Sequence, residues 1–494
     1  MTTSFARPRF AFAAVLTTSA LLAGACSSDG SPGIGAPKEP PRLETTGPEV
    51  LSDADGTGID VSKRLFESSD AVVVASTSRD DQLHGAAVAA QLGAPLLVRA
   101  LGSEAAIDAE IQRLGAERVI DVPGQDETLA QTAPVASDAA EGDVAAIAAL
   151  EPANPVKLVL PDMLATPETS LGAAATARAA GANLDVLGVA DPRLTSESMQ
   201  TVTAQDTLAL GRQWGTTEDY AHRVELAHNG ELPGGGGLVF PGRRMIALYG
   251  HSFAPELGVM GEQDPVAAAE LATQYAQQYQ PMEEQPVIPA FEIIVTVASE
   301  FPGEDGDYSN EAPIETVTPW IDAITEAGGY AVLDLQPGQG DFLHQAKLYE
   351  ELLKRPNVGL ALDSEWKLNP GEQPLSRVGS ASAEEINVVA DWLAQLTREN
   401  NLPQKAFVLH QFQLAMFPDR ENIQTAHPEL AYVLHADGHG SPGQKYDTWN
   451  VLREGLDPNF FMAWKNFIDE DQPTFTPEQT YMEVEPRPWF VSYQ

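Results

Sequence analysis

The stretch VGLALDSEW (358–366) joins an apolar run to two carboxylates, and the second half of the chain contains eight such apolar runs. Most of them end in acidic or other polar residues. The segments between them, such as 264–279 and 383–398, are long enough to form helices. Strands and helices that alternate in this way over about 250 residues predict a (β/α)8 barrel, here at 240–494. The other runs are MIALYG (245–250), VIPAFEIIVTVA (287–298), YAVLDLQPG (330–338), AFVLHQFQL (406–414), AYVLHADG (431–438), FFMAWKNFIDED (460–471) and WFVSYQ (489–494).

Acidic side chains stand at the ends of these predicted strands, where a (β/α)8 barrel builds its active site. Because side chains alternate between the two faces of a strand, Asp363 and Glu365 point to the same side, as do Asp334 and Gln336. A cup of carboxylates suits glycoside hydrolysis, in which one acid protonates the leaving oxygen and another attacks or activates water. Asp363 and Glu365 are the preferred pair. The candidate catalytic residues are Asp363, Glu365, Asp334, Glu292, Asp437 and Asp469.

Other polar and aromatic residues near the strand ends are candidates for binding a sugar. Aromatic rings stack on sugar faces, although they also simply fill protein cores. The acids have an alternative explanation too, in which they form ion pairs with Lys347, Lys367 and Lys465 and have no catalytic role. The candidate substrate-binding residues are Tyr249, His251, Gln336, Trp366, His410, His435, Trp464, Lys465 and Tyr493.

The sequence HADGHG (435–440) places His435, Asp437 and His439 at alternate positions, where one strand end could offer them to a divalent metal. A hydrogen-bonded site feature is the commoner role of such a lone cluster. The acidic loop 304–311 lacks the full spacing of an EF-hand, so a solvated loop is expected there. We therefore expect no metal and no other cofactor.

A separate α/β pattern precedes the barrel and predicts a doubly wound domain with a parallel sheet at 63–195. No glycine-rich phosphate loop follows its first two strands, so nucleotide binding is not expected. Residues 196–239 are expected to form a helical linker that ends in the glycine-rich boundary ELPGGGGL (231–238). The predicted strands of the domain are 70–76, 94–100 and 117–124, and the predicted helices are 84–93 and 105–116.

Three pieces of this domain resemble the cell wall-binding repeat 2 family of Gram-positive surface proteins. They are DAVVVAS, the small-residue helix before LGAPLLV, and the helix that leads into LGAERVIDVPG. A second, weaker copy follows at 156–193. The resemblance implies attachment to, or packing against, polymers of the cell envelope. A domain that serves only as a spacer is the alternative.

Two further resemblances concern the barrel. GLALDSEW (359–366) is similar to the strand-four D-x-E motif of the family 25 glycoside hydrolases, the peptidoglycan muramidases, and this implies roles in glycan cleavage for Asp363 and Glu365. Over 243–494 the chain resembles a group of actinobacterial secreted proteins and lipoproteins that pair a cell wall-binding repeat 2-like region with a glycosidase-like barrel. The matching stretches include LDLQPG, QAKLYEELL, VGLALDSEW, HQFQL and FVSYQ. This resemblance implies a fold and a location but no established activity.

Residues 1–25 have the composition of an export signal, with a basic start, an apolar segment at 10–22 and small residues before Cys26. LLAGACSS (21–28) resembles a bacterial lipobox, although Ala23 stands where leucine is usual, and this implies that Cys26 is lipidated and becomes the mature N-terminus. A plain secretory signal that is cleaved nearby is the alternative. Residues 26–62 are rich in Ser, Gly, Pro and Asp and are expected to form a flexible tether.

Charge and cysteine content narrow the function further. The net charge of −42 argues against nucleic-acid binding, which needs clustered Lys and Arg. The single cysteine excludes an intramolecular disulfide. The sequence thus predicts a protein that is lipid-anchored at Cys26 on the extracytoplasmic face of the cell membrane and whose barrel hydrolyses or binds cell-wall or extracellular glycan. A non-catalytic cell-wall-binding surface protein is the alternative.

Overall fold

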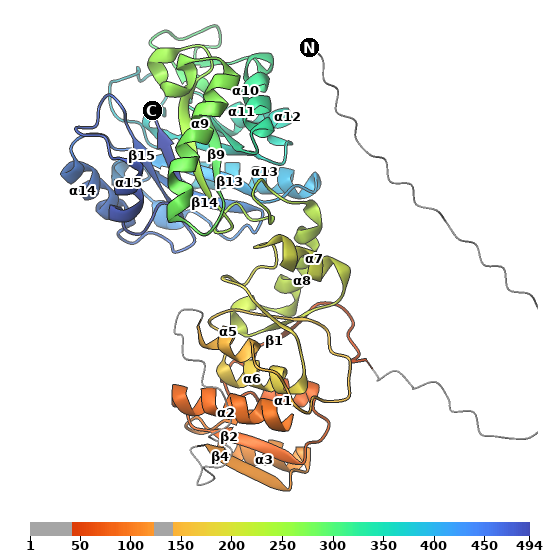
Figure 1. The fold of residues 1–494 in the computed structure, drawn as a ribbon. Helices are drawn as coiled ribbons and strands as arrows, with labels where there is room; N and C mark the ends of the chain where they lie inside the picture. Colours follow the sequence, from red (N-terminus) through yellow and green to blue (C-terminus); the bar gives the residue numbers. More distant parts are fainter. Residues whose placement is uncertain (1–41, 123–141) are drawn as a thin grey trace, which may run out of the picture. The chain divides into compact units, whose positions relative to one another are not determined.

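The computed structural model describes residues 42–122 and 142–494, and this part of the chain is mixed α/β (Figure 1). The expected export signal, Cys26 and the first part of the expected tether lie outside the described residues. Among the helices within the two described ranges, none combines the length and the apolar composition that a membrane crossing requires.

Eight parallel strands close into the barrel that the alternating pattern predicts, so the (β/α)8 barrel is confirmed. Each strand pairs with the next along the chain, and the last pairs with the first. A short antiparallel strand, β10 (Ser309–Glu311), extends the sheet beside the second strand. The barrel strands are β8 (Arg244–His251), β9 (Val287–Ala298), β11 (Tyr330–Leu335), β12 (Val358–Asp363), β13 (Lys405–Gln411), β14 (Leu430–Ala436), β15 (Phe461–Asn466) and β16 (Phe490–Tyr493).

Helices connect the strands and cover the outside of the barrel. The longest two have side-chain caps that the sequence makes recognisable: Asp264 accepts hydrogen bonds from the first turn of α9 (Pro265–Tyr279), and Ser382 does the same for α13 (Ala383–Glu399). Proline at the first position of α9 costs no hydrogen bond, because that N–H has no partner within a helix. The other helices of this layer are α10 (Ile314–Glu326), α11 (Phe342–Leu348), α12 (Glu350–Leu353), α14 (Pro442–Arg453) and α15 (Pro477–Glu483).

Successive side chains of each strand alternate between the barrel interior and the helix layer. Leu333, Phe407 and Leu434 face the helices and belong to the large core between strands and helices. Their neighbours in sequence face inward, where the space is narrow and small residues dominate. The middle of the interior is filled by Ala247, Ala290, Val332, Ala361, Val408, Val433, Ala463 and Phe490. The barrel is therefore a packed core and not a pore.

The base of the barrel is closed by the segment that precedes β8. Leu232, Val239 and Phe240 pack into the same interior cluster. Arg243 is fully buried below them, and its guanidinium donates hydrogen bonds to carbonyl groups of the glycine-rich loop 233–238. Gly236 has a φ of +72°, and a Cβ there would lie 2.5 Å from the carbonyl oxygen of Leu194. Glycine at this position thus lets the loop pass close to the backbone of Leu194 while its carbonyl groups bind Arg243.

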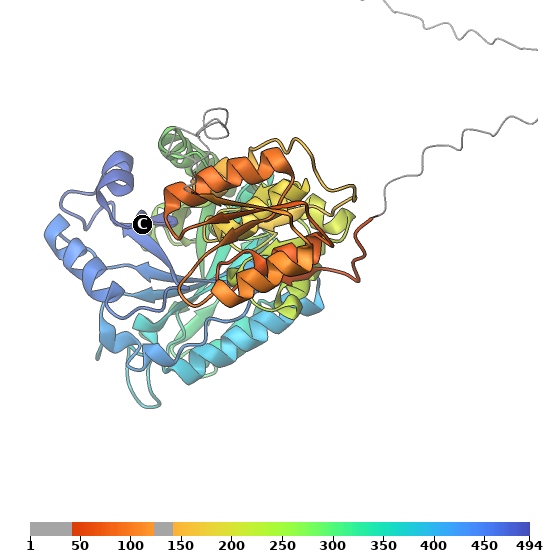
Figure 2. The same ribbon diagram turned by 90° about the horizontal axis from the view of Figure 1, so that it is seen from below.

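The described residues before the barrel contain two small parallel sheets. In the first, β2 (Ala71–Ala75) lies between β3 (Leu96–Val98) and β4 (Arg118–Val122), which corresponds to the first predicted strand–helix–strand unit. In Figure 2 its orange strands run between orange helices. The second sheet has the order β1-β7-β5-β6. The helices of this region are α1 (Ile59–Leu65), α2 (Arg79–Leu92), α3 (Glu104–Leu114), α5 (Asp143–Ala148), α6 (Leu171–Ala180), α7 (Ser196–Ala204) and α8 (Thr217–Leu226).

The second sheet differs from the sequence-based expectation. Its strand β1 (Glu49–Leu51) lies within the expected tether, and its partner β7 (Leu208–Leu210) lies within the expected helical linker. The segment 156–162, expected to be a strand, is irregular, and β5 (Met163–Ala165) follows it and pairs with β6 (Leu184–Val186). Strands of three residues among prolines and polar residues show too little alternation to be recognised in a sequence.

Phe407→Ala should lower the free energy of unfolding by about 3–5 kcal/mol, because it leaves a cavity between barrel and helices. Phe407 is fully buried, and its ring meets that of Tyr432 edge-on at 5.7 Å between centroids. Urea denaturation followed by tryptophan fluorescence measures this loss, since six of the seven tryptophans lie in 240–494. Val451→Ala, on the exposed side of α14, is the control and should change stability by less than about 0.5 kcal/mol. An equal loss of stability in the two variants would contradict the placement of Phe407 in the core between strands and helices.

Candidate active site

Every barrel strand contributes one polar side chain to a single layer near the carboxyl ends of the strands. Strand register places Asp363 beside His410, His410 beside His435, and Lys465 beside Ser492. All members of this polar layer are buried. Because buried polar and charged groups are costly without partners, they must satisfy one another. The polar layer consists of Tyr249, Glu292, Asp334, Asp363, His410, His435, Lys465 and Ser492.

His410 lies in the middle of the polar layer and contacts carboxylates through both ring nitrogens. Its Nδ1 is 2.9 Å from Oδ2 of Asp437, and its Nε2 is 2.9 Å from Oε1 of Glu292. Oδ1 of Asp334 is 4.0 Å from the same Nε2. Burial lowers the pKa of His410, but the neighbouring carboxylates outweigh burial and raise this pKa well above its usual value. The imidazole therefore bridges two acids as a cation.

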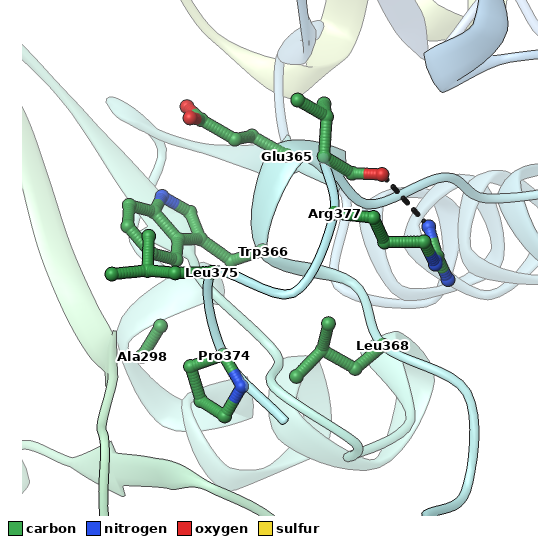
Figure 3. A pocket seen from close by; sticks show the side chains of 8 residues that line it. Ala298, Glu365, Trp366, Leu368, Pro374, Leu375 and Arg377 are labelled. Atoms are coloured by element: carbon green, nitrogen blue, oxygen red, sulfur yellow. Dashed lines mark hydrogen bonds between the residues drawn. The ribbon is translucent and has the colours of Figure 1, made fainter. Parts of the chain in front are cut away.

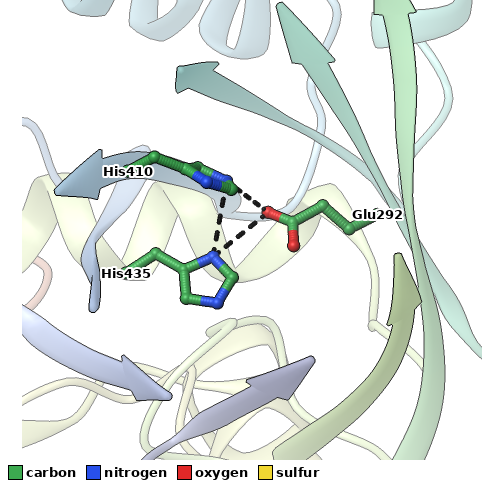
Figure 4. Close-up of side chains that lie close together, drawn as sticks. All are labelled: Glu292, His410 and His435. Atoms are coloured by element: carbon green, nitrogen blue, oxygen red, sulfur yellow. Dashed lines mark hydrogen bonds and ion pairs between the residues drawn. The ribbon is translucent and has the colours of Figure 1, made fainter. Parts of the chain in front are cut away.

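A second imidazole approaches the same carboxylate oxygen. Nδ1 of His435 is 3.4 Å from Oε1 of Glu292 and 3.4 Å from Nε2 of His410, as Figure 4 shows. Its other nitrogen, Nε2, lies 3.0 Å from Oγ of Ser492. Burial lowers the pKa of His435, and the charge of His410 adds to this. Burial raises the pKa of Glu292, but the two imidazoles outweigh it and hold this pKa below its usual value.

Tyr249, Asp334 and Lys465 form the opposite side of the polar layer. The Tyr249 hydroxyl donates to Oδ2 of Asp334 at 2.8 Å. Nζ of Lys465 lies 3.5 Å from the centre of the Tyr249 ring, close enough for a cation–π contact. Burial raises the pKa of Asp334, even though His410 and Lys465 lower it. The lysine thus places its positive charge among several carboxyls instead of pairing with one of them.

Asp363 and Glu365 line the same cavity, although β12 ends at Asp363 and Glu365 lies in the 3-10 turn that follows the strand. Oδ1 of Asp363 accepts a hydrogen bond from the Glu365 backbone N–H at 3.2 Å. Burial raises the pKa of both carboxyls, most strongly that of Asp363. The pKa of Asp437 is shifted the other way, because its hydrogen bond to His410 outweighs burial. The pKa is therefore raised for both members of the preferred pair and lowered for their neighbour Asp437.

A cavity of about 460 Å³ opens at this end of the barrel. Asp363, Glu365 and Asp437 line it, together with Tyr249, Gln336 and Lys465. The aromatic wall comes from Trp366 and from two loop residues that the sequence did not single out, Phe412 and Phe467. The remaining lining residues are Leu257, Ile294, Val297, Ala298, Gly438, His439, Gln444, Thr448 and Gln494.

A second hollow of about 210 Å³ adjoins this cavity (Figure 3). It shares Ala298, Glu365 and Trp366 with the main cavity. The rest of its wall is mostly apolar, and Arg377 is held there by a hydrogen bond to the Val378 carbonyl. Glu365 and Trp366 thus stand where a polar cavity meets an apolar hollow.

Two aromatic residues expected to bind substrate face away from the cavity. The Trp464 ring packs among aromatic rings of the helix layer, and its Nε1 donates to Asn466. The Tyr493 hydroxyl lies 2.6 Å from that of Tyr279 in the outer core. Strand alternation accounts for this correction, because Lys465 and Ser492 point inward and their neighbours must point outward.

Two further candidates lie beyond the ends of their strands. Asp469 is exposed in the turn that follows β15 and does not line the cavity. His251 is half-buried at the end of β8, where its Nδ1 accepts a hydrogen bond from the Phe253 N–H. The expectation that both residues line the cavity is therefore wrong. β8 and β15 reach the cavity through earlier residues, Tyr249 and Lys465.

The side chains of His435, Asp437 and His439, whose spacing in HADGHG could suit a metal site, do not point to one place. His435 turns to Glu292, whereas Asp437 is bonded to His410. His439 is exposed, and its ring lies against Phe467 with 5.5 Å between centroids. Two buried sets do gather possible ligand atoms within 4.8 Å of one another: Glu292, His410 and His435, and Asp363, His410 and Asp437.

The alternative explanation of the acids, ion pairing with lysines, finds little support at the cavity. Lys367 pairs with Glu385 at 3.1 Å, away from the preferred acids. Within the described residues, no lysine or arginine lies within 4.0 Å of the carboxyl oxygens of Asp363, Glu365 or Asp437. Among these three carboxyls, only that of Asp437 therefore has a cationic partner within the described residues, the His410 imidazole.

Comparisons of the chain with models of protein families, with curated proteins and with solved structures find no match. The strand pairing alone defines the class of the domain, a (β/α)8 barrel with a carboxyl-lined cavity at the carboxyl ends of its strands. What such a cavity does must be argued from its side chains.

Lys445→Met should lower the free energy of unfolding by about 3–5 kcal/mol, because it leaves the buried Asp471 without its counter-ion. Nζ of Lys445 donates to Oδ2 of Asp471 at 2.7 Å and to the Lys465 carbonyl at 2.6 Å. These bonds join the chain after β14 to the chain after β15 beside the cavity. Urea denaturation measures the loss, and adding Asp471→Asn should restore part of it. If Lys445→Met alone were as stable as the wild type, the ion pair between Lys445 and Asp471 would not stabilise the fold.

Proposed function

We propose that the barrel hydrolyses glycosidic bonds in a cell-wall or extracellular glycan. The observation that carries this proposal is that the carboxyls of Asp363, Glu365 and Asp437 line one cavity at the carboxyl end of the barrel. Glycoside hydrolysis requires a proton donor and a second carboxylate on either side of the scissile bond. A cavity with three carboxyls, of which only Asp437 is paired with the His410 imidazole, offers candidates for both roles.

Glu365 is assigned as the proton donor. Its side chain is half-buried and borders both the main cavity and the adjoining hollow, so a sugar that spans the two passes it. Burial raises the pKa of Glu365, and the charge of Asp437 adds to this. A carboxyl that keeps its proton to higher pH is suited to protonate a leaving oxygen.

Asp437 is assigned as the second carboxylate, which attacks the sugar or activates a water. The hydrogen bond from His410 at 2.9 Å fixes one of its oxygens, while Oδ1 has no hydrogen-bond partner among the described residues. A carboxylate in the cavity wall that is oriented through one oxygen suits this role. Asp363 holds the backbone of Glu365 through its hydrogen bond and acts as a positioning residue.

A polymeric sugar is supported by the shape and lining of the site. The cavity of about 460 Å³ has the size of a small-ligand pocket, and the adjoining hollow extends it past Trp366. Trp366, Phe412 and Phe467 offer rings against which sugar faces can stack. Lys465 and Gln336 supply polar groups that can bind hydroxyls.

The proposal also includes where the protein acts, at the outer face of the cell membrane. The export signal at 1–25 and the lipobox-like LLAGACSS support an anchor at Cys26 on the extracytoplasmic face of the membrane, where wall glycans are the abundant polymers. The resemblance of 63–195 to cell wall-binding repeat 2 supports the same class of partner. The net charge of −42 supports a partner other than nucleic acid.

Glu365→Gln and Asp437→Asn should each lower kcat/KM for sugar release by about 100-fold or more, because each removes one half of the acid–base pair. The assay measures reducing sugar that the full chain releases from peptidoglycan and from an arabinogalactan-type polymer. Asp469→Asn, which alters an exposed carboxyl, is the matched control and should act like the wild type. The activity of the wild type should fall on the alkaline side at a pH above the ordinary glutamate pKa, because Glu365 is active only while protonated.

Sugar release that persists in both site variants would contradict the residue assignment. A wild-type chain that releases no sugar from either polymer would contradict hydrolysis, and retention of that chain on insoluble wall material would then support the non-catalytic binding protein.

Cys26→Ser should move the protein from the membrane fraction to the medium, because it removes the thiol that accepts the lipid. Metabolic labelling with a palmitate analogue, followed by fractionation, measures this. Equal labelling of the two proteins would contradict lipidation at Cys26, and a soluble wild type would support the plain secretory signal.

A further inference from the structure

We propose that Glu292, His410 and His435 bind a divalent transition-metal ion, of the kind typified by Zn²⁺, beneath the carboxyl-lined cavity. His410 and His435 come from the adjacent strands β13 and β14, Glu292 comes from β9 across the barrel interior, and all three are fully buried (Figure 4). This inference goes beyond glycoside hydrolysis and does not depend on it, since the ion would lie below the carboxyls assigned to that reaction.

The first argument is geometric. Nε2 of His410, Nδ1 of His435 and Oε1 of Glu292 form a triangle with sides of 2.9, 3.4 and 3.4 Å. Ligand atoms about 2.0–2.1 Å from a tetrahedral ion lie about 3.3–3.4 Å from one another, so this triangle has the dimensions of one face of such a site. Two imidazole nitrogens and one carboxylate oxygen are also the donor types that zinc and similar ions accept.

The second argument is the support behind each imidazole. His410 turns its other nitrogen, Nδ1, to Asp437, and His435 turns its other nitrogen, Nε2, to Ser492. Metal-binding histidines nearly always have such a partner on the far nitrogen, because it fixes the tautomer and the ring orientation. Both rings are thus held with one nitrogen directed at the same point beside Glu292.

The third argument concerns buried oxygen atoms without hydrogen-bond partners. Oε2 of Glu292, Oδ1 of Asp334 and Oδ1 of Asp437 have none among the described residues. Asp334 is fully buried, and its free Oδ1 lies 4.0 Å from Nε2 of His410, which places it beside the triangle as a fourth ligand, directly or through water. A buried polar atom without a partner destabilises the fold, the more so when it is charged, so a cation at this point would stabilise it.

A balance of charges favours the same conclusion. The polar layer and the cavity wall together hold five carboxyls and one lysine, Lys465. A divalent ion bound by Glu292, His410 and His435 would add two positive charges beside these carboxyls.

The other buried set, Asp363, His410 and Asp437, offers only one nitrogen and would require His410 to use its Nδ1. The exposed acids Asp305, Asp307 and Glu311 offer only oxygens on a loop. The set with two imidazoles therefore suits a transition-metal ion best.

The test is to equilibrate the purified full chain with Zn²⁺, dialyse it against metal-free buffer and measure bound zinc by plasma mass spectrometry. We expect one ion per chain. Glu292→Gln and His435→Asn should lose it, whereas Asp363→Asn and Asp307→Asn should keep it. Co²⁺ in place of Zn²⁺ should give the intense visible bands of four-coordinate cobalt. Ser492→Ala, which keeps every ligand, should weaken Zn²⁺ affinity by about 10–100-fold.

Ser492→Ala keeps the proposal testable if the ligand variants fail to fold, which circular dichroism would show. A wild-type chain that retains no zinc above the buffer background would overturn the proposal. Loss of zinc on Asp363→Asn, with retention in Glu292→Gln, would also overturn it and would move the ion to the other buried set.

Discussion

The contact of one imidazole with two buried acids organises the polar end of the barrel. His410 is fully buried and reaches Glu292 through one nitrogen and Asp437 through the other, both at 2.9 Å. Charges interact strongly in buried surroundings, so the pKa of each neighbouring carboxyl depends on this ring. The two carboxyls that hydrogen-bond to the ring have a lowered pKa, whereas burial raises the pKa of the others.

Strand alternation made much of the site predictable. The acidic ends of the apolar runs identify the barrel strands, and Asp363 lies at the end of one of them. Glu365 reaches the same cavity from the 3-10 turn that follows this strand. In the last two strands, alternation directs Ser492 inward and Trp464 and Tyr493 outward. Closeness to a strand end alone does not determine which face of the strand a side chain occupies.

Other parts of the structure leave no periodic pattern in the sequence. Phe412 and Phe467 reach the cavity from connections whose course depends on tertiary contacts, such as the bond between Lys445 and Asp471. The pairing of β1 with β7 joins segments that are distant in the sequence and too short to show alternation. The meeting of Glu292 with two histidines likewise requires closure of the barrel, which brings three separate strands to one point.

The sealed base of the barrel limits how a polymer can use the cavity. Arg243, the loop wrapped around it and the small residues packed above leave no passage along the barrel axis. A long chain therefore cannot be threaded through and must lie across the mouth, and fragments must leave by the route through which the substrate arrived. The cavity is thus a cup with a floor, and the connections after the strands alone decide how far a ligand extends on either side of it.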